Sequence, residues 1–235
     1  MNKNILWLAL AALLISACGR APVTVQPIPL APTQAPLSEK EMYRDEFDKD
    51  INKDWGYTIM TGLPEQLLWS QDSGNLSMEL MGSNDTIFTF LNKKETFKDV
   101  AVQAEFEYAN RPEMMYAVIC RASDKGWYEF RVSPKGTWEL VRYDAALKVD
   151  GKNPYSSFTD RQGGAGSVKA GKNTITISCK GDQITGFVNG EQIDFEKRFF
   201  TATDSTFTDG GIGFAVLGYG KSADLTINWI SALRP

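Results

Sequence analysis

The residues best suited to bind a ligand are polar side chains that alternate with apolar ones along three segments of the chain. They comprise Gln103, Glu105, Arg121, Trp127, Glu129 and Arg131. If the three segments are neighbouring strands, these residues form one patch in which hydrogen-bonding groups surround an aromatic ring. A sugar can bind such a patch, because its flat apolar face stacks on a ring while its hydroxyls bond to polar groups. The alternative is a solvated sheet face that carries charges of both signs.

Trp127 makes the strongest case among these residues, because the water-facing side of a strand rarely carries tryptophan without a function. Further aromatic residues, Tyr143, Tyr155 and Phe158, lie in or beside a Gly/Ser-rich stretch from Asp144 to Gly166. Loops at the rim of a β-sandwich often carry binding residues, although long loops are also often only mobile. The sequence therefore predicts a ligand face on the strands, with these loop aromatics as less specific candidates.

The composition excludes several kinds of chemistry. The chain has no histidine, so it lacks the commonest metal ligand and the commonest general base of proteins. Zinc sites and Ser–His or Cys–His nucleophile systems are therefore excluded. The net charge of -4 and the pI near 5.1 provide no electrostatic basis for binding nucleic acid.

One acidic segment resembles the beginning of a calcium-binding loop. It reads Asp48-Lys49-Asp50-Ile51-Asn52, but Lys53 stands where the EF-hand pattern needs glycine, and Ile59 stands where it needs glutamate. No other calcium ligand set can be identified from the sequence. We predict no metal site and no cofactor, and calcium is the one alternative left open.

The chain has three cysteines, Cys18, Cys120 and Cys179. Cys120 and Cys179 each lie in the apolar phase of an alternating segment, so both side chains are expected to point into the core. There they could meet between neighbouring strands or across two sheets. If the chain is exported to an oxidising compartment, a Cys120–Cys179 disulfide is expected. The alternative is a pair of inert buried thiols.

Alternation of apolar and polar residues indicates β-strands over most of the chain. It is clearest in residues 76–80, 100–108, 127–133 and 174–179. Turn signals separate the segments, and Asn189-Gly190 is the strongest hairpin signal because both residues tolerate positive φ. No segment of helical length has an apolar stripe with a period of 3.6 residues. These patterns predict an all-β fold, an antiparallel β-sandwich.

The first residues have the pattern of an export signal. A lysine stands near the start, an uninterrupted apolar run follows from Ile5 to Ile15, and small residues precede Cys18. The run is too short for a membrane-spanning helix, which needs roughly 20 apolar residues. We therefore predict a signal peptide over residues 1–17.

The end of this signal, Leu14-Ile15-Ser16-Ala17-Cys18, resembles the bacterial lipobox. The resemblance implies cleavage before Cys18, a diacylglycerol on its sulfur and a fatty acyl group such as palmitate on its new amino end. Two or more lipid chains anchor a protein stably to a membrane. Gly19 favours the outer membrane if the cell has one; otherwise the outer face of the plasma membrane is expected. The alternative is an ordinary cleaved signal with a chance cysteine nearby.

Two regions follow the signal. Residues 18–40 are rich in Pro, Ala, Thr and Gln without apolar periodicity, so we expect a semi-rigid tether after the lipidated cysteine. Residues 41–235 are long enough for one domain with a sizeable core. The predicted organisation is a β-sandwich head held by lipid at a membrane.

Several segments of this head resemble the concanavalin A-like lectin/glucanase family, the LamG-type jelly rolls of many bacterial exported proteins. The segments are Asp45-Glu46-Phe47 with Trp55, the runs Ala117–Leu140 and Asn173–Ile193, and the closing GGIGFAVLG and LTINWISAL. Together they cover nearly the whole region after the tether. The resemblance implies an antiparallel jelly-roll sandwich.

The family does not by itself assign a function, because its fold hosts lectins, hydrolases and interaction domains. Glucanases of this fold carry a Glu-x-Asp-x-x-Glu strand, which puts nucleophile and acid on one face. The closest match here, Glu105-Phe106-Glu107, lacks the third acid. Related keto-disaccharide hydrolases usually show Asn-Ser-Gly where this chain has Tyr116-Ala117-Val118-Ile119. We therefore predict a lipid-anchored cell-envelope protein whose head binds carbohydrate or another surface ligand without catalysis.

Two other functions stay open. A structural or partner-binding envelope protein would show a broad exposed apolar patch, whereas a tryptophan in a polar groove favours a glycan. A glycoside hydrolase of the same fold is the alternative with the least support, because the carboxylate spacing is missing.

Overall fold

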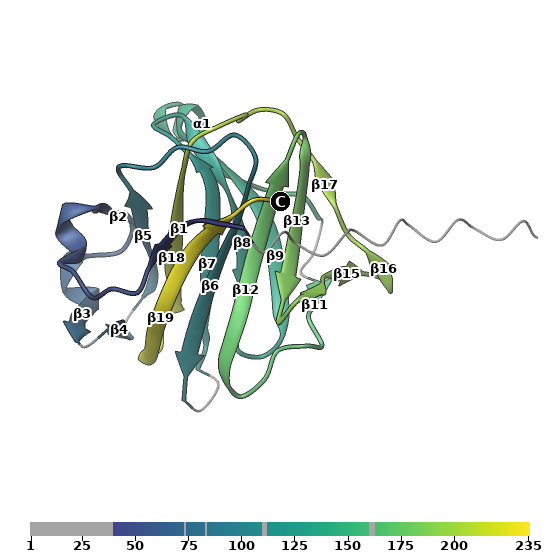
Figure 1. Ribbon diagram of the computed structural model, residues 1–235. Coiled ribbons are helices and arrows are strands. Elements are labelled where there is room, and N and C mark those ends of the chain that lie inside the picture. The colour runs from purple at the N-terminus through teal and green to yellow at the C-terminus, as the bar shows by residue number, and fades with distance from the viewer. Residues whose placement is uncertain (1–39, 73, 83, 110–111, 160–162) are drawn as a thin grey trace, which may run out of the picture. The chain divides into compact units, whose positions relative to one another are not determined.

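The computed structural model describes residues 40–72, 74–82, 84–109, 112–159 and 163–235 (Figure 1). The predicted signal peptide, the lipid-attachment residue Cys18 and the tether up to residue 39 lie outside these residues. Within them, no helix is long and apolar enough to cross a membrane.

Two large antiparallel sheets face each other and form a β-sandwich (Figure 1). Sheet A has the order β14-β13-β12-β6-β19-β4-β3, with β1 also paired to β19 and β17 to β13. Its strands are β1 (Glu41–Asp45), β3 (Leu67–Asp72), β4 (Asn75–Leu80), β6 (Val100–Tyr108), β12 (Gly171–Lys180), β13 (Gln183–Val188), β14 (Glu191–Gln192), β17 (Ala202–Thr203) and β19 (Ala223–Leu233).

Sheet B has the order β10-β9-β8-β7-β18-β5-β2, with β11 also paired to β9. Its strands are β2 (Trp55–Thr61), β5 (Asp85–Asn92), β7 (Met114–Ala122), β8 (Gly126–Val132), β9 (Thr137–Asp144), β10 (Tyr155–Ser157), β11 (Gly163–Gly164) and β18 (Gly211–Tyr219). The remaining elements are the short hairpin of β15 (Asp194–Phe195) and β16 (Arg198–Phe199), the helix α1 (Ala145–Val149) and 3-10 turns at Ile51–Lys53 and Pro64–Gln66. The prediction of an all-β antiparallel sandwich is confirmed.

Large apolar side chains from both sheets fill the space between them. Phe106 of β6 stacks on Tyr116 of β7 with ring centroids 4.6 Å apart, and both side chains are fully buried. Phe130 of β8 packs on the backbone of β13 at Gly186, where a Cβ would stand 2.6 Å from the ring. Burial of each such side chain contributes about 1.5 to 3 kcal/mol, so this core holds the two sheets together.

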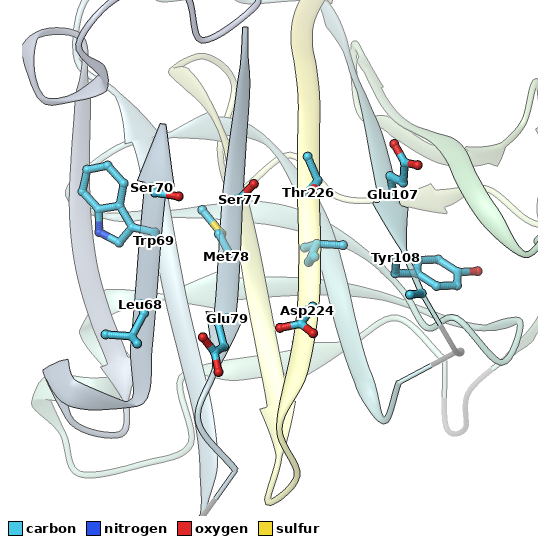
Figure 2. Close-up of a pocket in the computed structure, with 12 residues that line it drawn as sticks. Leu68, Trp69, Ser70, Ser77, Met78, Glu79, Glu107, Tyr108, Asp224 and Thr226 are labelled. Carbon is cyan, nitrogen blue, oxygen red and sulfur yellow. The ribbon is translucent and has the colours of Figure 1, made fainter. Parts of the chain in front are cut away.

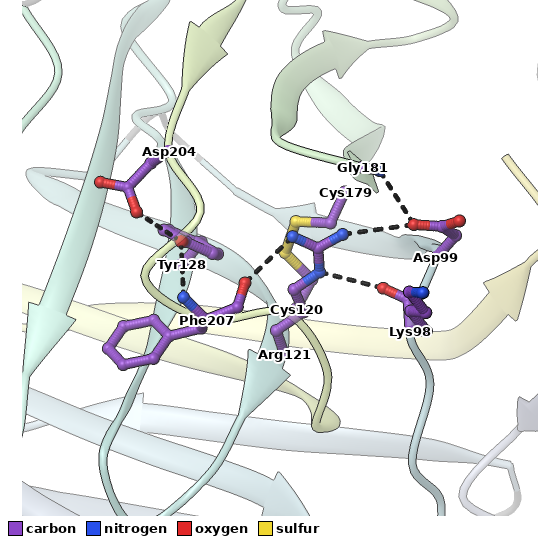
Figure 3. Close-up of a disulfide and its surroundings, with 9 residues drawn as sticks. All are labelled: Lys98, Asp99, Cys120, Arg121, Tyr128, Cys179, Gly181, Asp204 and Phe207. Carbon is purple, nitrogen blue, oxygen red and sulfur yellow. Dashed lines mark hydrogen bonds and ion pairs between the residues drawn. A yellow bond between two sulfur atoms is a disulfide. The ribbon is translucent and has the colours of Figure 1, made fainter.

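A disulfide joins the two sheets. Cys120 of β7 and Cys179 of β12 are bonded, with their Cα atoms 6.6 Å apart and both side chains fully buried (Figure 3). The predicted Cys120–Cys179 disulfide is confirmed. Of the two placements that the sequence left open, the structure has the one across sheets.

A carboxylate beside this end of the sandwich holds the segment before β18. Asp204 accepts hydrogen bonds from the Tyr128 hydroxyl at 2.6 Å and from the Thr206 backbone amide at 2.7 Å, and it pairs with Arg142 at 2.6 Å. Burial by itself raises the pKa of Asp204, but the hydrogen bonds from Tyr128 and Thr206 and the charge of Arg142 outweigh it and lower the pKa below its usual value. Burial, with the hydrogen bond to Asp204, raises the pKa of Tyr128 to about 12.

The lowered pKa of Asp204 makes the free energy of unfolding depend on pH. The pKa of Asp204 is lower in the folded protein than in the unfolded chain. The resulting stabilisation is fully present when the pH is above the unfolded-state pKa, and it is lost as the pH falls through the folded-state pKa. We expect Asp204→Asn to lower the free energy of unfolding at neutral pH by about 1 kcal/mol, after allowance for solvent screening. Urea denaturation should show this difference shrinking below about pH 4. An equal difference at neutral and acid pH would contradict the prediction.

Candidate functional site

The six residues of the predicted ligand face do not form one patch. Gln103 and Glu105 lie on β6 in sheet A, whereas Trp127, Glu129 and Arg131 lie on β8 in sheet B. The prediction of a single patch is therefore wrong. Alternation gives the phase of a side chain within its strand, but it does not give the sheet to which the strand belongs.

Arg121 has a structural role. Its side chain is fully buried and donates to the backbone oxygens of Lys98 and Phe207, both at 3.0 Å, and to the Asp99 carboxylate at 3.3 Å (Figure 3). The backbone of Arg121 has a φ of 54°, and β7 has a bulge at this position where it pairs with β18. The bulge breaks the alternation of inward and outward side chains, so the side chain of Arg121 does not lie on the polar face that alternation predicts. Arg121 therefore ties three segments together beside Cys120 and is closed to a ligand.

The two residues on sheet A are also engaged by neighbours. Glu105 accepts a hydrogen bond from Asn228 at 2.8 Å and lies 3.6 Å from the ammonium of Lys172. Lys172 also lies 3.5 Å from Glu107. Gln103 donates to the Thr176 hydroxyl at 3.2 Å. These contacts give the surface charges of both signs. Trp229 of β19 pairs with Glu105 and lines a hollow of about 600 Å³ with it, and the guanidinium of Arg44 lies 4.4 Å from the centre of the Trp229 ring.

A hollow of about 550 Å³ lies across β3, β4, β19 and β6 of sheet A (Figure 2). Carboxylates and hydroxyls line it, with Glu79 and Asp224 directly opposite each other on neighbouring strands. The tryptophan in its wall, Trp69, packs edge-on against the core residue Phe90 at 6.4 Å. The hollow can hold polar groups, but its tryptophan is engaged with the core.

The outer face of sheet B is unusual because it is also covered. Every residue of β8 is buried, including Trp127 with an exposed fraction of 5% and Glu129 with 0%. The cover comes from the segment after β9, where Ala145 and Tyr155 pack on a second apolar cluster. Trp127 is therefore not the water-facing ring that the sequence predicts, because α1 and the residues that lead into β10 lie over this face, while β10 itself extends sheet B beside β9.

The three β8 residues that the sequence predicted for the ligand face do form one network there. The carboxylate of Glu129 accepts hydrogen bonds from Trp127 Nε1 at 2.6 Å and from Arg131 Nε at 2.7 Å. The rings of Trp127 and Tyr143 stack at 4.1 Å, and Tyr143 contacts Tyr155 at 5.2 Å. The guanidinium carbon of Arg131 lies 4.4 Å from the centre of the Tyr155 ring. A buried ion pair is thus enclosed by a row of aromatic rings.

Two polar groups of this network are incompletely satisfied. Arg131 Nη2 and the Tyr155 hydroxyl are both buried, and the guanidinium is close enough to Tyr155 to offset part of the rise in its pKa that burial causes, but neither group makes a hydrogen bond of good geometry within the described part of the chain. An unpaired buried polar group costs about 1 to 3 kcal/mol, so proteins rarely keep one without a reason. Both residues line a hollow of about 400 Å³ on the outer face of sheet B, which we call the Arg131 hollow.

Four more residues give the Arg131 hollow its polar and aromatic wall. They are Asp85 of β5, Lys148 of α1, Asn153 before β10 and Tyr219 at the end of β18. Tyr219 is 43% exposed, so part of this residue is open to solvent at the hollow. The sequence reasoning missed these four. The signal for Tyr219 was an aromatic residue at the end of an apolar strand, directly before Gly220.

Three tyrosines and Arg131 keep fixed charge states at and beside the Arg131 hollow near neutral pH. Burial raises the pKa of Tyr155, with a further increase from the charge of Glu129, and burial also raises the pKa of Tyr143 and Tyr219. Burial alone would lower the pKa of Arg131, but the charge of Glu129 outweighs it and the pKa is raised. The tyrosines therefore stay neutral hydroxyls and Arg131 stays a cation, so all can donate hydrogen bonds.

No metal site stands out in the ranges that the structure describes, because they contain no group of three or more His, Cys, Asp or Glu residues able to hold an ion. The segment that resembles the start of a calcium loop forms a 3-10 turn instead. There Asp50 caps the turn by accepting from the Asn52 backbone amide at 3.1 Å.

Comparisons with known proteins agree on the fold. No protein-family model matches the sequence, and no curated protein matches it. Among solved structures, a carbohydrate-binding module, CBM66 from Bacillus subtilis, is similar with a TM-score of 0.50 and 13% identity, over 74% of this chain and 92% of that one. A Bacillus subtilis protein of unknown function with a galectin-like fold has a TM-score of 0.55 and 14% identity, over 83% and 98%. A laminarinase from Flavobacterium sp. UMI-01 has a TM-score of 0.57 and 12% identity, over 83% and 100%.

These similarities show a jelly-roll β-sandwich of the galectin and concanavalin A-like kind, which confirms the predicted fold. The neighbours include both binding modules and hydrolases. At such low identity the likeness extends to the fold alone, so the function has to be argued from the site.

Proposed function

We propose that the β-sandwich is a carbohydrate-binding module whose ligand occupies the Arg131 hollow. The observation that carries the proposal is a pair of buried donors without a hydrogen bond of good geometry, Arg131 Nη2 and the Tyr155 hydroxyl, on two residues that line a hollow. A small shift of these side chains toward the hollow would let sugar hydroxyls satisfy them, and the half-exposed Tyr219 offers a ring for stacking. A hollow of about 400 Å³ lies within the usual range for small-ligand sites.

The electrostatics support binding rather than hydrolysis. A retaining glycosidase needs two carboxylates about 5 Å apart with the scissile bond between them. Asp85 is the carboxylate that lines this hollow, and the nearby Glu129 and Glu139 both pair with Arg131, at 2.7 and 3.5 Å. A guanidinium thus holds two of these three carboxylates, which leaves no free pair for such a reaction. We therefore propose a module without catalytic activity.

A screen on a glycan array tests both parts of this proposal. We expect purified full-length protein in detergent to bind at least one neutral glycan and to release no reducing sugar from it over hours. A folded protein that binds no glycan would refute the carbohydrate-binding function and direct attention to a protein partner in the envelope. Release of reducing ends would refute the non-catalytic assignment.

We further propose that the chain is an exported lipoprotein, held by lipid on Cys18 at the outer membrane if the cell has one, and otherwise at the outer face of the plasma membrane. The residues before Cys18 support this, since they resemble a lipobox after a short apolar run. The Cys120–Cys179 disulfide also supports export, because such bonds persist in oxidising compartments. The tether would then present the glycan-binding head away from the bilayer.

Replacement of Cys18 tests the anchor. We expect Cys18→Ala to abolish incorporation of labelled palmitate and to leave the protein unprocessed or released from the membrane fraction, because no sulfur remains to carry the lipid. Cys120→Ala serves as the matched control and should still be labelled. Unchanged labelling and fractionation of Cys18→Ala would rule out this anchor.

A further inference from the structure

A second hollow adjoins the Arg131 hollow at the same end of sheet B. It has a volume of about 350 Å³, and its wall includes Met115 of β7 and Ser133, Lys135 and Thr137 around the β8–β9 turn. Tyr219 lines both hollows. We call this second one the Lys135 hollow.

Strand register explains why the two hollows meet. Tyr219 pairs with Asp85 of β5, which lines the Arg131 hollow. Two residues earlier on β18, Leu217 of the Arg131 hollow lies opposite Met115 of β7 in the Lys135 hollow. The exposed ring of Tyr219 therefore stands between two depressions on one face.

Charges around the two hollows cancel. Glu113 is held between Lys135 and Lys221, each at 2.8 Å, and hydrogen bonds from these lysines lower the pKa of Glu113 to about 2. Arg131 is likewise paired with Glu129 and Glu139. Asp85 and Lys148 contribute one charge of each sign. This balance provides no net attraction for an anionic or a cationic ligand.

We infer that the natural ligand is a neutral linear oligosaccharide that crosses Tyr219 and occupies both hollows, rather than a single terminal sugar. This inference rests on the proposed carbohydrate-binding function. One sugar unit satisfies the donors of Arg131 and Tyr155, a neighbouring unit lies over the Lys135 hollow, and the Tyr219 ring stacks against the chain between them. Affinity should therefore grow with chain length, because a longer ligand gains contacts in the second hollow without the cost of a second association.

Calorimetric titration of full-length protein in detergent with two neutral series tests this inference. The probes are glucose through laminaritetraose, and xylose through xylotetraose. For one series we expect the affinity of the tetrasaccharide to exceed that of the monosaccharide by about tenfold or more, with little change between low and high salt. Tyr219→Ala should remove this gain, whereas Phe199→Ala, which alters another exposed ring away from both hollows, should keep it.

The possible outcomes distinguish failure of this inference from failure of the proposed carbohydrate-binding function. Equal affinity for the monosaccharide and the tetrasaccharide would overturn the two-hollow ligand and leave carbohydrate binding intact. Binding restricted to charged or branched glycans on the array, with neither neutral series bound, would also overturn it while the broader function stands. Absence of binding to any glycan would overturn both.

Discussion

Removing the disulfide, in the variant Cys120→Ala with Cys179→Ala, is expected to lower the free energy of unfolding by about 4 kcal/mol. The bond closes a loop with a sequence separation of 59 residues, and a loop of this length loses much of its conformational freedom in the unfolded chain when its ends are joined. The two cysteines lie in different sheets, so the bond also resists separation of the sandwich layers. Urea denaturation of the variant and of the oxidised protein measures the difference.

A control distinguishes the covalent bond from the packing of the side chains. The oxidised wild type with reductant added should approach the stability of the double variant, because both lack the bond while the surrounding core is otherwise the same. Arg121, which holds Lys98, Asp99 and Phe207 beside the bond, should keep the reduced fold assembled at low denaturant. If the double variant lost less than about 1 kcal/mol in the free energy of unfolding, the disulfide would not restrict the unfolded chain enough to stabilise the fold by this mechanism.

Removing the buried guanidinium, in Arg131→Met, is expected to cost about 3 to 5 kcal/mol of stability, because it leaves the carboxylate of Glu129 buried and unpaired. Glu129 has no exposed surface, and its remaining partner is the neutral Trp127 indole. Methionine keeps much of the length of the arginine side chain and packs against Tyr155, so the loss reflects charge more than volume. Thermal and urea unfolding measure it.

The matched double variant isolates the charge. Adding Glu129→Gln to Arg131→Met should restore more than half of the lost stability, because glutamine is neutral and still accepts the hydrogen bond from Trp127. Glu129→Gln alone should cost less than Arg131→Met. If the double variant were as unstable as the sum of the two single variants, the two residues would not be coupled and the buried ion pair would not hold this network together.

Much of the fold could be predicted from the sequence, because strand alternation and turn residues are local signals. The phase of Cys120 and Cys179 placed both in the core, and the predicted export made their bond the expected result; the structure has that bond. Whether they met between neighbours or across sheets could not be decided, because the pairing of strands depends on contacts between distant segments.

The candidate site could be predicted only in part for the same reason. Glu105 and Glu129 occupy the same kind of polar phase, yet their strands belong to opposite layers. Nor does alternation show that α1 and the residues that lead into β10 cover sheet B, because the Gly/Ser-rich segment that forms them carries no amphipathic pattern. Tyr155 was noted as a loop aromatic, but its place above Arg131 depends on this fold-back.

The cover over sheet B also changes how its polar residues affect stability and binding. On an open sheet face, Glu129 and Arg131 would be ordinary solvated charges with little effect on stability. Under α1 and the residues that lead into β10, they form a buried pair, and Arg131 Nη2 lacks a hydrogen bond of good geometry beside a hollow. The proposed glycan-binding function depends on that donor and on the Tyr155 hydroxyl.

The most direct test of this function is the variant Tyr155→Phe, measured for both stability and glycan affinity. Removing an unpartnered buried hydroxyl should leave the melting temperature unchanged or raise it, because phenylalanine needs no hydrogen-bond partner. The affinity for the glycan found on the array should fall by about tenfold, because a sugar oxygen loses its donor. Unchanged affinity in a stably folded variant would contradict the placement of the ligand in the Arg131 hollow.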